Sequence, residues 1–181
     1  ESLLKEFPQA AIGIHELNGS ESRSNAYASA SLSGKLQLNP KMMGDRAKLD
    51  QSYENDVLVK WHPDGTSSVH IASHEIGHLL ESALVFKNIT QTGYYGTVDR
   101  IAAWNKHRFA TKVVSEAARA AKKNAAGKGL TNDQLVAQIS RYATKNRSEA
   151  MAEAVADYRA NGSRAKPLSQ AIWKILKREL G

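Results

Sequence analysis

The stretch that decides the fold is His74-Glu75-Ile76-Gly77-His78, which lies in a segment whose apolar residues recur at helical spacing. On a helix, residues four apart lie one turn above each other on the same face. The imidazoles of His74 and His78 should therefore project from one side and grip a single ion. We expect this helix to begin at Ser67 or Ser68, a residue type that favours the N-cap position. The stretch predicts half of a metal site.

Two histidines that flank a glutamate fit the chemistry of catalytic zinc. Such a site takes three protein ligands and keeps a fourth position open for water, and Glu75 is placed to accept a proton from that water. The chain has no cysteine, so imidazole and carboxylate are the ligands it offers to Zn²⁺. The residues three and six beyond His78 are Glu81 and Leu84, rather than the Gly and His of metzincins. We expect a hydrolase with a His-His-acid zinc site.

The stronger candidates for the third ligand lie on a later helix. Glu149, Glu153 and Asp157 recur every four residues in a segment otherwise rich in Ala, Met and Val. Acids on a mostly apolar helix are costly to bury unless they are paired or bound to metal. A solvated acidic stripe is the alternative, but the histidine motif upstream favours a metal site.

The same segment carries a family resemblance. The run YATKNRSEAMAEAVADY, from Tyr142 to Tyr158, resembles the metal-binding helix of the anthrax toxin lethal factor family of zinc metallopeptidases. In that family a Tyr, six intervening residues and Glu-x-x-x-Glu-Ala follow the HExxH motif. The resemblance implies that Glu149 binds zinc, that Glu153 supports a ligand and that Tyr142 stabilises the transition state. It implies a zinc-dependent endopeptidase of zincin-like fold that acts on a peptide or protein.

A second resemblance concerns the end of the chain. The segment from Pro167 to Leu180 is similar to the tail that follows this motif in peptidase-like domains of phage head-morphogenesis proteins. It implies a phage-encoded member. The localisation stays open between phage-associated, cytoplasmic and secreted, because a chain without cysteine suits either redox compartment.

A rival third ligand is Asp99. Gly96-Thr97-Val98-Asp99 resembles the GTxD motif of the aspzincins, in which the Asp is the ligand, although Ala102-Ala103 stands where Tyr-Gly is expected. We favour Glu149. Asp99 would otherwise be an acid in the first turn of a helix, where it is favourable to the helix dipole.

Length and composition favour one domain. The chain has 181 residues, and its 41% hydrophobic content suits one domain with a real core but hardly two. No apolar run approaches the roughly 18 residues of a membrane span, and the amino end does not resemble a signal peptide. Because the chain opens on Glu1 rather than Met, we expect residues 1–181 to be a single metallopeptidase domain cut from a longer protein.

The first third of the chain is expected to form strands. Three short alternating runs are separated by turn residues: Ala11 to Leu17, Ala26 to Leu32 and Lys35 to Asn39. They predict a small antiparallel or mixed sheet. A short helix over Met42 to Tyr53 and another strand over Val57 to Trp61 should follow.

The remainder is expected to be helical. Beyond the histidine helix, four segments have helical character: Val98 to Asn124, Asn132 to Ala143, Glu149 to Ala160 and Ser169 to Leu180. Thr131 and Gln134 form a capping-box pattern at the second start. The predicted class is α+β, with an amino-terminal sheet, an active-site helix and a helical carboxyl-terminal half.

The charge is unevenly distributed. Residues 1–100 hold 9 Lys+Arg and 12 Asp+Glu, a net of −3, and residues 101–181 hold 16 and 6, a net of +10. The competing function is a non-catalytic, zinc-stabilised domain that binds a protein or nucleic acid through basic helices. No aromatic interleaving accompanies the charge, so a nucleic-acid partner is not favoured. A substrate could instead be held by main-chain hydrogen bonds along Lys35 to Asn39 as an edge strand. The oligomeric state is left open.

Overall fold

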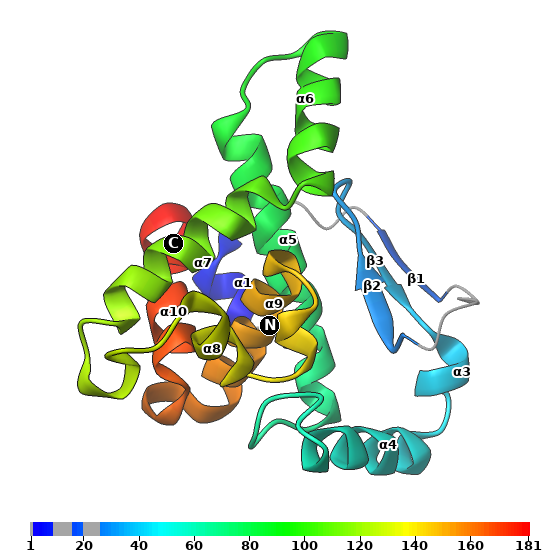
Figure 1. The fold of residues 1–181 in the computed structure, drawn as a ribbon. Coiled ribbons are helices and arrows are strands. Elements are labelled where there is room, and N and C mark those ends of the chain that lie inside the picture. The colour runs from blue at the N-terminus through cyan, green and yellow to red at the C-terminus, as the bar shows by residue number, and fades with distance from the viewer. Residues whose placement is uncertain (1, 9–15, 20–25) are drawn as a thin grey trace.

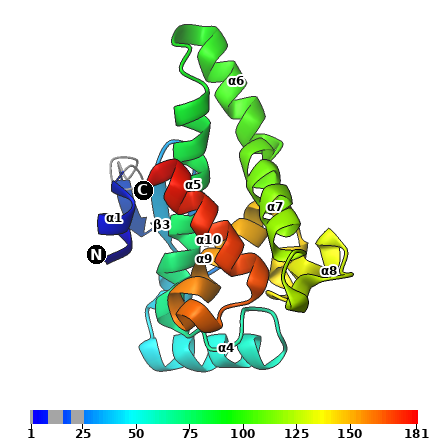
Figure 2. The ribbon, with the colours of Figure 1, turned by 90° about the vertical axis from the view of Figure 1, so that its left-hand side faces the viewer.

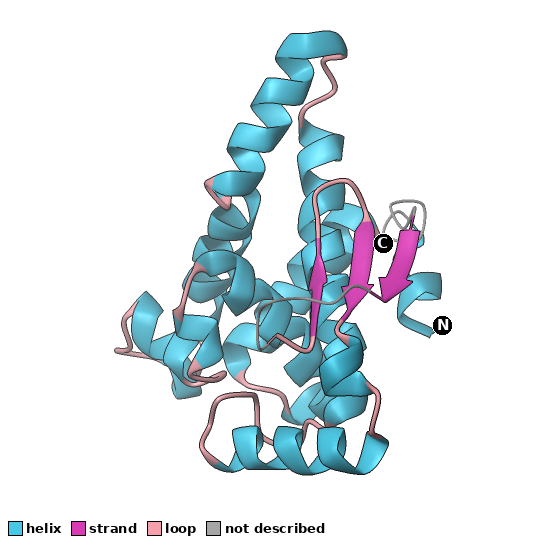
Figure 3. Cartoon of the chain, turned by 90° about the vertical axis from the view of Figure 1, so that its right-hand side faces the viewer, coloured by secondary structure: helices cyan, strands magenta, loops and turns pink. Residues whose placement is uncertain are grey.

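The computed structural model describes residues 2–8, 16–19 and 26–181. Most of this part of the chain is helical, and a small sheet lies on one side of the helices (Figures 1 and 3). The α+β class expected from the sequence is confirmed. Outside the sheet the main helices are α1 (Ser2–Glu6), α3 (Pro40–Met43), α4 (Arg46–Leu58), α5 (Ile71–Asn88), α6 (Gly93–Asn105), α7 (Arg108–Ala121), α8 (Asn132–Ala137), α9 (Arg147–Asn161) and α10 (Pro167–Leu180).

The sheet is mixed and has three strands in the order β1-β3-β2. Strand β1 (Glu16–Gly19) runs parallel to β3 (Lys35–Leu38), and β2 (Ala28–Ala30) runs antiparallel to it. A strand therefore forms within each of the three predicted runs, but β2 is shorter than its predicted run and β1 extends through Asn18 and Gly19, which were predicted as a turn. Residues 11–15 of the first run lie outside the described residues. β2 packs against α5, and the Ser82 hydroxyl of α5 donates to the carbonyl of Leu32 at 2.8 Å.

The expectation that Lys35 to Asn39 forms an edge strand is wrong. β3 is the central strand, and its main chain pairs with β1 on one side and β2 on the other. The cause is the parallel pairing of Glu16 with Lys35, which local alternation of residues does not reveal. β1 and β2 are therefore the edge strands of the described sheet.

The strand predicted over Val57 to Trp61 is also wrong. Helix α4 continues to Leu58, and the chain then turns at Lys60, which has a φ of 60°. Leu58 and Val59 are 77% and 56% exposed, so these apolar residues do not belong to a buried strand. A short apolar run is compatible with either a strand or a helix, and here the preceding helix extends into it.

Helix α5 carries the histidines and packs along α9 (Figure 1). Ser67, one of the two expected N-caps, caps a short 3₁₀ turn, Ser68–His70, and α5 itself begins after that turn with His70 as its N-cap. Gly77 faces α9 so closely that a Cβ built on it would lie 2.6 Å from the Cα of Ala152. Residues 150–156 of α9 are all buried, and small side chains dominate among them. This close contact brings the acids of α9 to the histidines of α5.

Helices α7 and α10 cover the opposite side of α9 (Figure 2). The helix predicted over Val98 to Asn124 is divided into α6 and α7, because His107 adopts a left-handed conformation with a φ of 48°. The helix predicted over Asn132 to Ala143 ends early, at Ala137, although its Thr131–Gln134 capping box is confirmed. None of the described helices is long and apolar enough to cross a membrane.

Candidate metal centre

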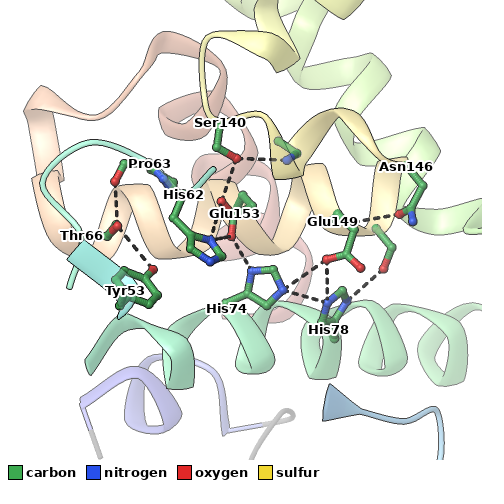
Figure 4. Close-up of polar contacts among 12 residues, drawn as sticks. Tyr53, His62, Pro63, Thr66, His74, His78, Ser140, Asn146, Glu149 and Glu153 are labelled. Carbon is green, nitrogen blue, oxygen red and sulfur yellow. Dashed lines mark hydrogen bonds and ion pairs between the residues drawn. The ribbon is translucent and has the colours of Figure 1, made fainter. Parts of the chain in front are cut away.

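Three potential ligand atoms converge between α5 and α9. The Nε2 atoms of His74 and His78 lie 3.2 Å apart, and the Glu149 Oε2 atom lies 3.2 Å from the first and 3.3 Å from the second (Figure 4). Among the described residues, these three side chains form the group of His and acidic residues that could hold a metal ion. The spacing of four residues along α5 places both imidazoles on the face that meets α9.

The triangle of donor atoms fits a tetrahedral ion. With Zn–N and Zn–O bonds of about 2.0 to 2.2 Å, two ligands of a tetrahedral site lie about 3.3 to 3.5 Å apart, close to all three observed separations. The Glu149 Oε2 atom is buried and makes no aligned hydrogen bond, although both Nε2 atoms are near it. The three atoms therefore converge on one position between α5 and α9.

The start of α9 positions Glu149. The side chain of Asn146 is the N-cap, and its Oδ1 atom accepts a hydrogen bond at 2.9 Å from the backbone N–H of Glu149 itself. Glu149 is 17% exposed at its side chain. Burial alone would raise the pKa of this carboxyl, but the two adjacent imidazoles hold its pKa well below the usual range. The Glu149 side chain is thus a carboxylate throughout the neutral pH range.

Glu153 contacts His74 on the ring nitrogen that faces away from Glu149. Its Oε1 atom lies 2.7 Å from the His74 Nδ1 atom, and its side chain is 1% exposed. A carboxylate only accepts hydrogen bonds, so Nδ1 must donate and Nε2 faces the metal position. Burial alone would lower the pKa of His74, but the adjacent carboxylates of Glu149 and Glu153 raise that pKa to about 10. Without an ion, a proton therefore binds His74.

His62, which was not among the predicted site residues, also contacts Glu153. Its Nδ1 atom lies 3.2 Å from Glu153 Oε1, and its ring stacks on Tyr53 with centroids 4.6 Å apart. The Ser140 hydroxyl donates to the other oxygen of Glu153 at 2.7 Å. His62 and Glu153 are 91 residues apart, so no spacing rule links them. The only sequence feature that marks His62 is its position just before the turn residues Pro63-Asp64-Gly65, and that feature does not predict a contact with Glu153.

His78 has a different support. Its Nδ1 atom lies 3.0 Å from the Ser148 hydroxyl oxygen, and that hydroxyl donates to Glu81 in a short hydrogen bond. Glu81 is fully buried on α5, and its Oε1 atom has no hydrogen-bond partner among the described residues. Burial raises the pKa of Glu81, and the Ser148 hydroxyl opposes that rise. Ser148 and Glu81 were not among the predicted site residues.

Glu75 and Tyr142 border a cavity beside the triangle. The cavity has a volume of about 690 Å³, and its walls include Tyr27, Tyr53, Trp61 and His62. Glu75 is 5% exposed, its Oε2 atom has no hydrogen-bond partner among the described residues, and burial raises its pKa. A carboxyl with a raised pKa and a free oxygen is suited to proton transfer.

Tyr142 lies on a 3₁₀ turn (Tyr142–Thr144) just before α9. Its backbone N–H donates to the carbonyl of Trp61 at 3.1 Å, which fixes the turn against the loop after α4. Its ring centroid is 5.6 Å from that of His74. Burial and the nearby carboxylates of Glu149 and Glu75 hold the pKa of the phenol above its usual value. The hydroxyl therefore keeps its proton and can donate it in a hydrogen bond.

The remaining acids considered from the sequence lie elsewhere. Asp157, the third acid of α9, accepts hydrogen bonds from the Asn161 side chain at 2.8 Å and from the Lys166 backbone at 2.9 Å, so it ties down the loop after α9. Asp99 is exposed on α6, which stands beyond the carboxyl end of α5, far along that helix from His74 (Figure 1). The structure brings Glu149, and not Asp99, to the two histidines.

Comparison of the chain with known proteins found no matching family model, no matching curated protein and no matching solved structure.

Proposed function

We propose that this protein is a zinc-dependent endopeptidase with a zincin-like, lethal factor-like catalytic centre. The observation that carries the proposal is the triangle of His74, His78 and Glu149 donor atoms, each pair 3.2 to 3.3 Å apart, with Glu75 beside it at a cavity. Two imidazoles and one carboxylate are a ligand set typical of catalytic zinc. A site that only stabilised the fold would have no use for a buried, unpaired carboxyl next to it.

His74, His78 and Glu149 would hold the ion, and the buried carboxylate of Glu153 would keep His74 in its ligating orientation. When bound, zinc supplies a Lewis acid that polarises the scissile carbonyl and lowers the pKa of water to about 7. Glu75 then accepts the proton of the attacking water and later returns it to the leaving amine. The Tyr142 phenol donates a hydrogen bond to the oxyanion as negative charge develops on it.

The proposed substrate is a peptide or protein segment bound in the cavity. Ala28 of β2 is part of the cavity wall, and β2 is an edge strand of the sheet. An extended segment could add to such an edge by main-chain hydrogen bonds. The proposed position of the substrate is therefore against β2 rather than against Lys35 to Asn39.

The test combines metal analysis with cleavage. Purified protein should contain about one zinc per chain and cleave members of a peptide library, and Glu75→Gln should keep the zinc but lower the cleavage rate by about 10² to 10⁴-fold. Glu54→Gln, an exposed acid on α4, is the matched control and should behave as the original protein. Zinc without any cleavage would support the zinc-stabilised binding domain instead, and cleavage that survives Glu75→Gln would contradict the mechanism.

A further inference from the structure

The Nδ1 atoms of His74 and His78, which face away from the proposed metal position, have different hydrogen-bond partners. His74 Nδ1 lies directly against a carboxylate, 2.7 Å from Glu153 Oε1. His78 Nδ1 instead lies 3.0 Å from the Ser148 hydroxyl, which in turn donates a hydrogen bond to Glu81. Ser148 is 4% exposed and Glu81 is fully buried, so water does not compete freely for these bonds.

The direction of these bonds follows from counting protons. A hydroxyl has one proton, and that of Ser148 is donated to Glu81. With Glu81 present as a carboxylate, the hydroxyl can then only accept from His78, so His78 carries its proton on Nδ1. The Nε2 atom of His78 is left with its lone pair, directed toward His74 Nε2 and Glu149 Oε2 at 3.2 and 3.3 Å.

We propose that Ser148 and Glu81 are positioning residues that fix the tautomer and ring orientation of His78 for metal binding. The inference rests on the proposed metal centre and adds two residues to it. Neither touches the reacting atoms, and Glu81 acts only through Ser148. Partners of this kind on the far nitrogen of a ligating histidine hold its ring and raise its basicity.

The relay exists only when α5 and α9 are packed together. Glu81 lies three residues after His78 on α5, whereas Ser148 belongs to α9 and directly precedes Glu149. α9 therefore supplies both a ligand and the hydroxyl that orients another ligand. The proposed metal ligands are therefore oriented correctly only when α5 and α9 are packed correctly against each other.

The experiment measures metal affinity, independently of cleavage. Zinc affinity is determined by competition with a chromophoric chelator, and the absorption spectrum of the Co²⁺-loaded protein reports ligand geometry. Ser148→Ala should weaken zinc binding about 10 to 100-fold and alter the cobalt spectrum. Ser169→Ala is the matched control, because it removes another buried hydroxyl, one without a partner in the described structure, from α10. It should change neither.

Glu81→Gln tests the second member of the relay. It should also weaken zinc binding, and combining it with Ser148→Ala should cause no further loss, because Glu81 acts only through that hydroxyl. Wild-type zinc affinity in Ser148→Ala, or additive losses in the double variant, would overturn the proposal. If Ser148→Ala does not fold, wild-type affinity in Glu81→Gln is the overturning result. If the unmodified protein binds zinc but cleaves no peptide, the endopeptidase proposal is contradicted, whereas the proposed roles of Ser148 and Glu81 in metal binding are not.

Discussion

Gly77 and Ala152 are in closer contact than any side chain at position 77 would allow. A Cβ at Gly77 would lie 2.6 Å from the Ala152 Cα atom, which is backbone and cannot turn away. Gly77 lies between the two histidines in the sequence, and Ala152 lies one turn beyond Glu149 on α9. The contact therefore sets the distance across which the three ligand atoms meet.

Gly77→Ala should destabilise the fold and impair the metal site together. Overpacking typically costs about 1 to 3 kcal/mol, more than the roughly 1 kcal/mol that alanine gains over glycine in a helix. The separated helices should also weaken zinc binding. Chemical denaturation and zinc competition test both effects. Ala72→Val is the control, because it adds volume at an exposed position of the same helix and should leave zinc affinity unchanged. A normal zinc affinity in Gly77→Ala would contradict the prediction and show that α9 shifts to make room for the added methyl group.

Glu149→Ala and Asp99→Ala should have opposite outcomes. Without Glu149 the ion keeps two imidazoles and lacks its anionic ligand, so zinc should be released during dialysis. Asp99→Ala should retain one zinc per chain, because Asp99 is exposed on α6. Zinc content by elemental analysis decides the matter. The reverse result would restore the aspzincin-like assignment and remove the role given to Tyr142.

Glu153→Gln should lower zinc affinity or activity by about 10 to 100-fold, the usual effect of losing a residue that orients a metal ligand. The amide keeps the volume of Glu153 but removes the charge that faces His74 and His62 at 2.7 and 3.2 Å. Asp157→Asn, at a buried acid one turn further along α9, is the control. Its effect should fall on stability, measured by thermal unfolding, and not on zinc affinity.

Tyr142→Phe should reduce kcat with little change in zinc affinity or KM, because the hydroxyl is needed mainly in the transition state. A lost oxyanion donor costs about 3 kcal/mol, or roughly 100-fold in rate. Tyr95→Phe, exposed on α6, provides the comparison. An unfolded Tyr142→Phe protein, or one with an unchanged rate, would remove this residue from the mechanism.

Zinc binding should release a proton at neutral pH. In the metal-free protein the pKa of His74 is raised from 6.5 to about 10, so the imidazole is charged at pH 7 and must lose its proton to bind the ion. Zinc affinity should rise by up to about tenfold per pH unit between pH 7 and 9. Calorimetry in buffers of different ionisation enthalpy counts the protons. Affinity that is independent of pH in this range would contradict the raised pKa.

The same shift affects the stability of the metal-free protein. A raised folded-state pKa stabilises the fold fully below the unfolded value of 6.5, and this stabilisation is lost as the pH rises toward 10. The metal-free protein should therefore become less stable between pH 7 and 10. The zinc-bound protein should not show this loss, because its His74 is already neutral.

The sequence by itself determined the local parts of the site. Helix geometry depends only on near neighbours, and it places residues four apart on one helix face. The sequence therefore predicted that His74 and His78 share a face of α5 and that Glu149 and Glu153 share a face of α9. It also predicted the capping box at Thr131. The central position of β3, the helical end of α4 and the break at His107 required the whole fold.

Only the tertiary structure decided which side chains support the ligands. His62 reaches Glu153 across 91 residues, and Ser148 reaches His78 across 70. These contacts depend on the close approach of α5 and α9 at Gly77 and on the loop that follows α4. Residue spacing is informative along one helix, whereas contacts between elements depend on the packing of the entire core.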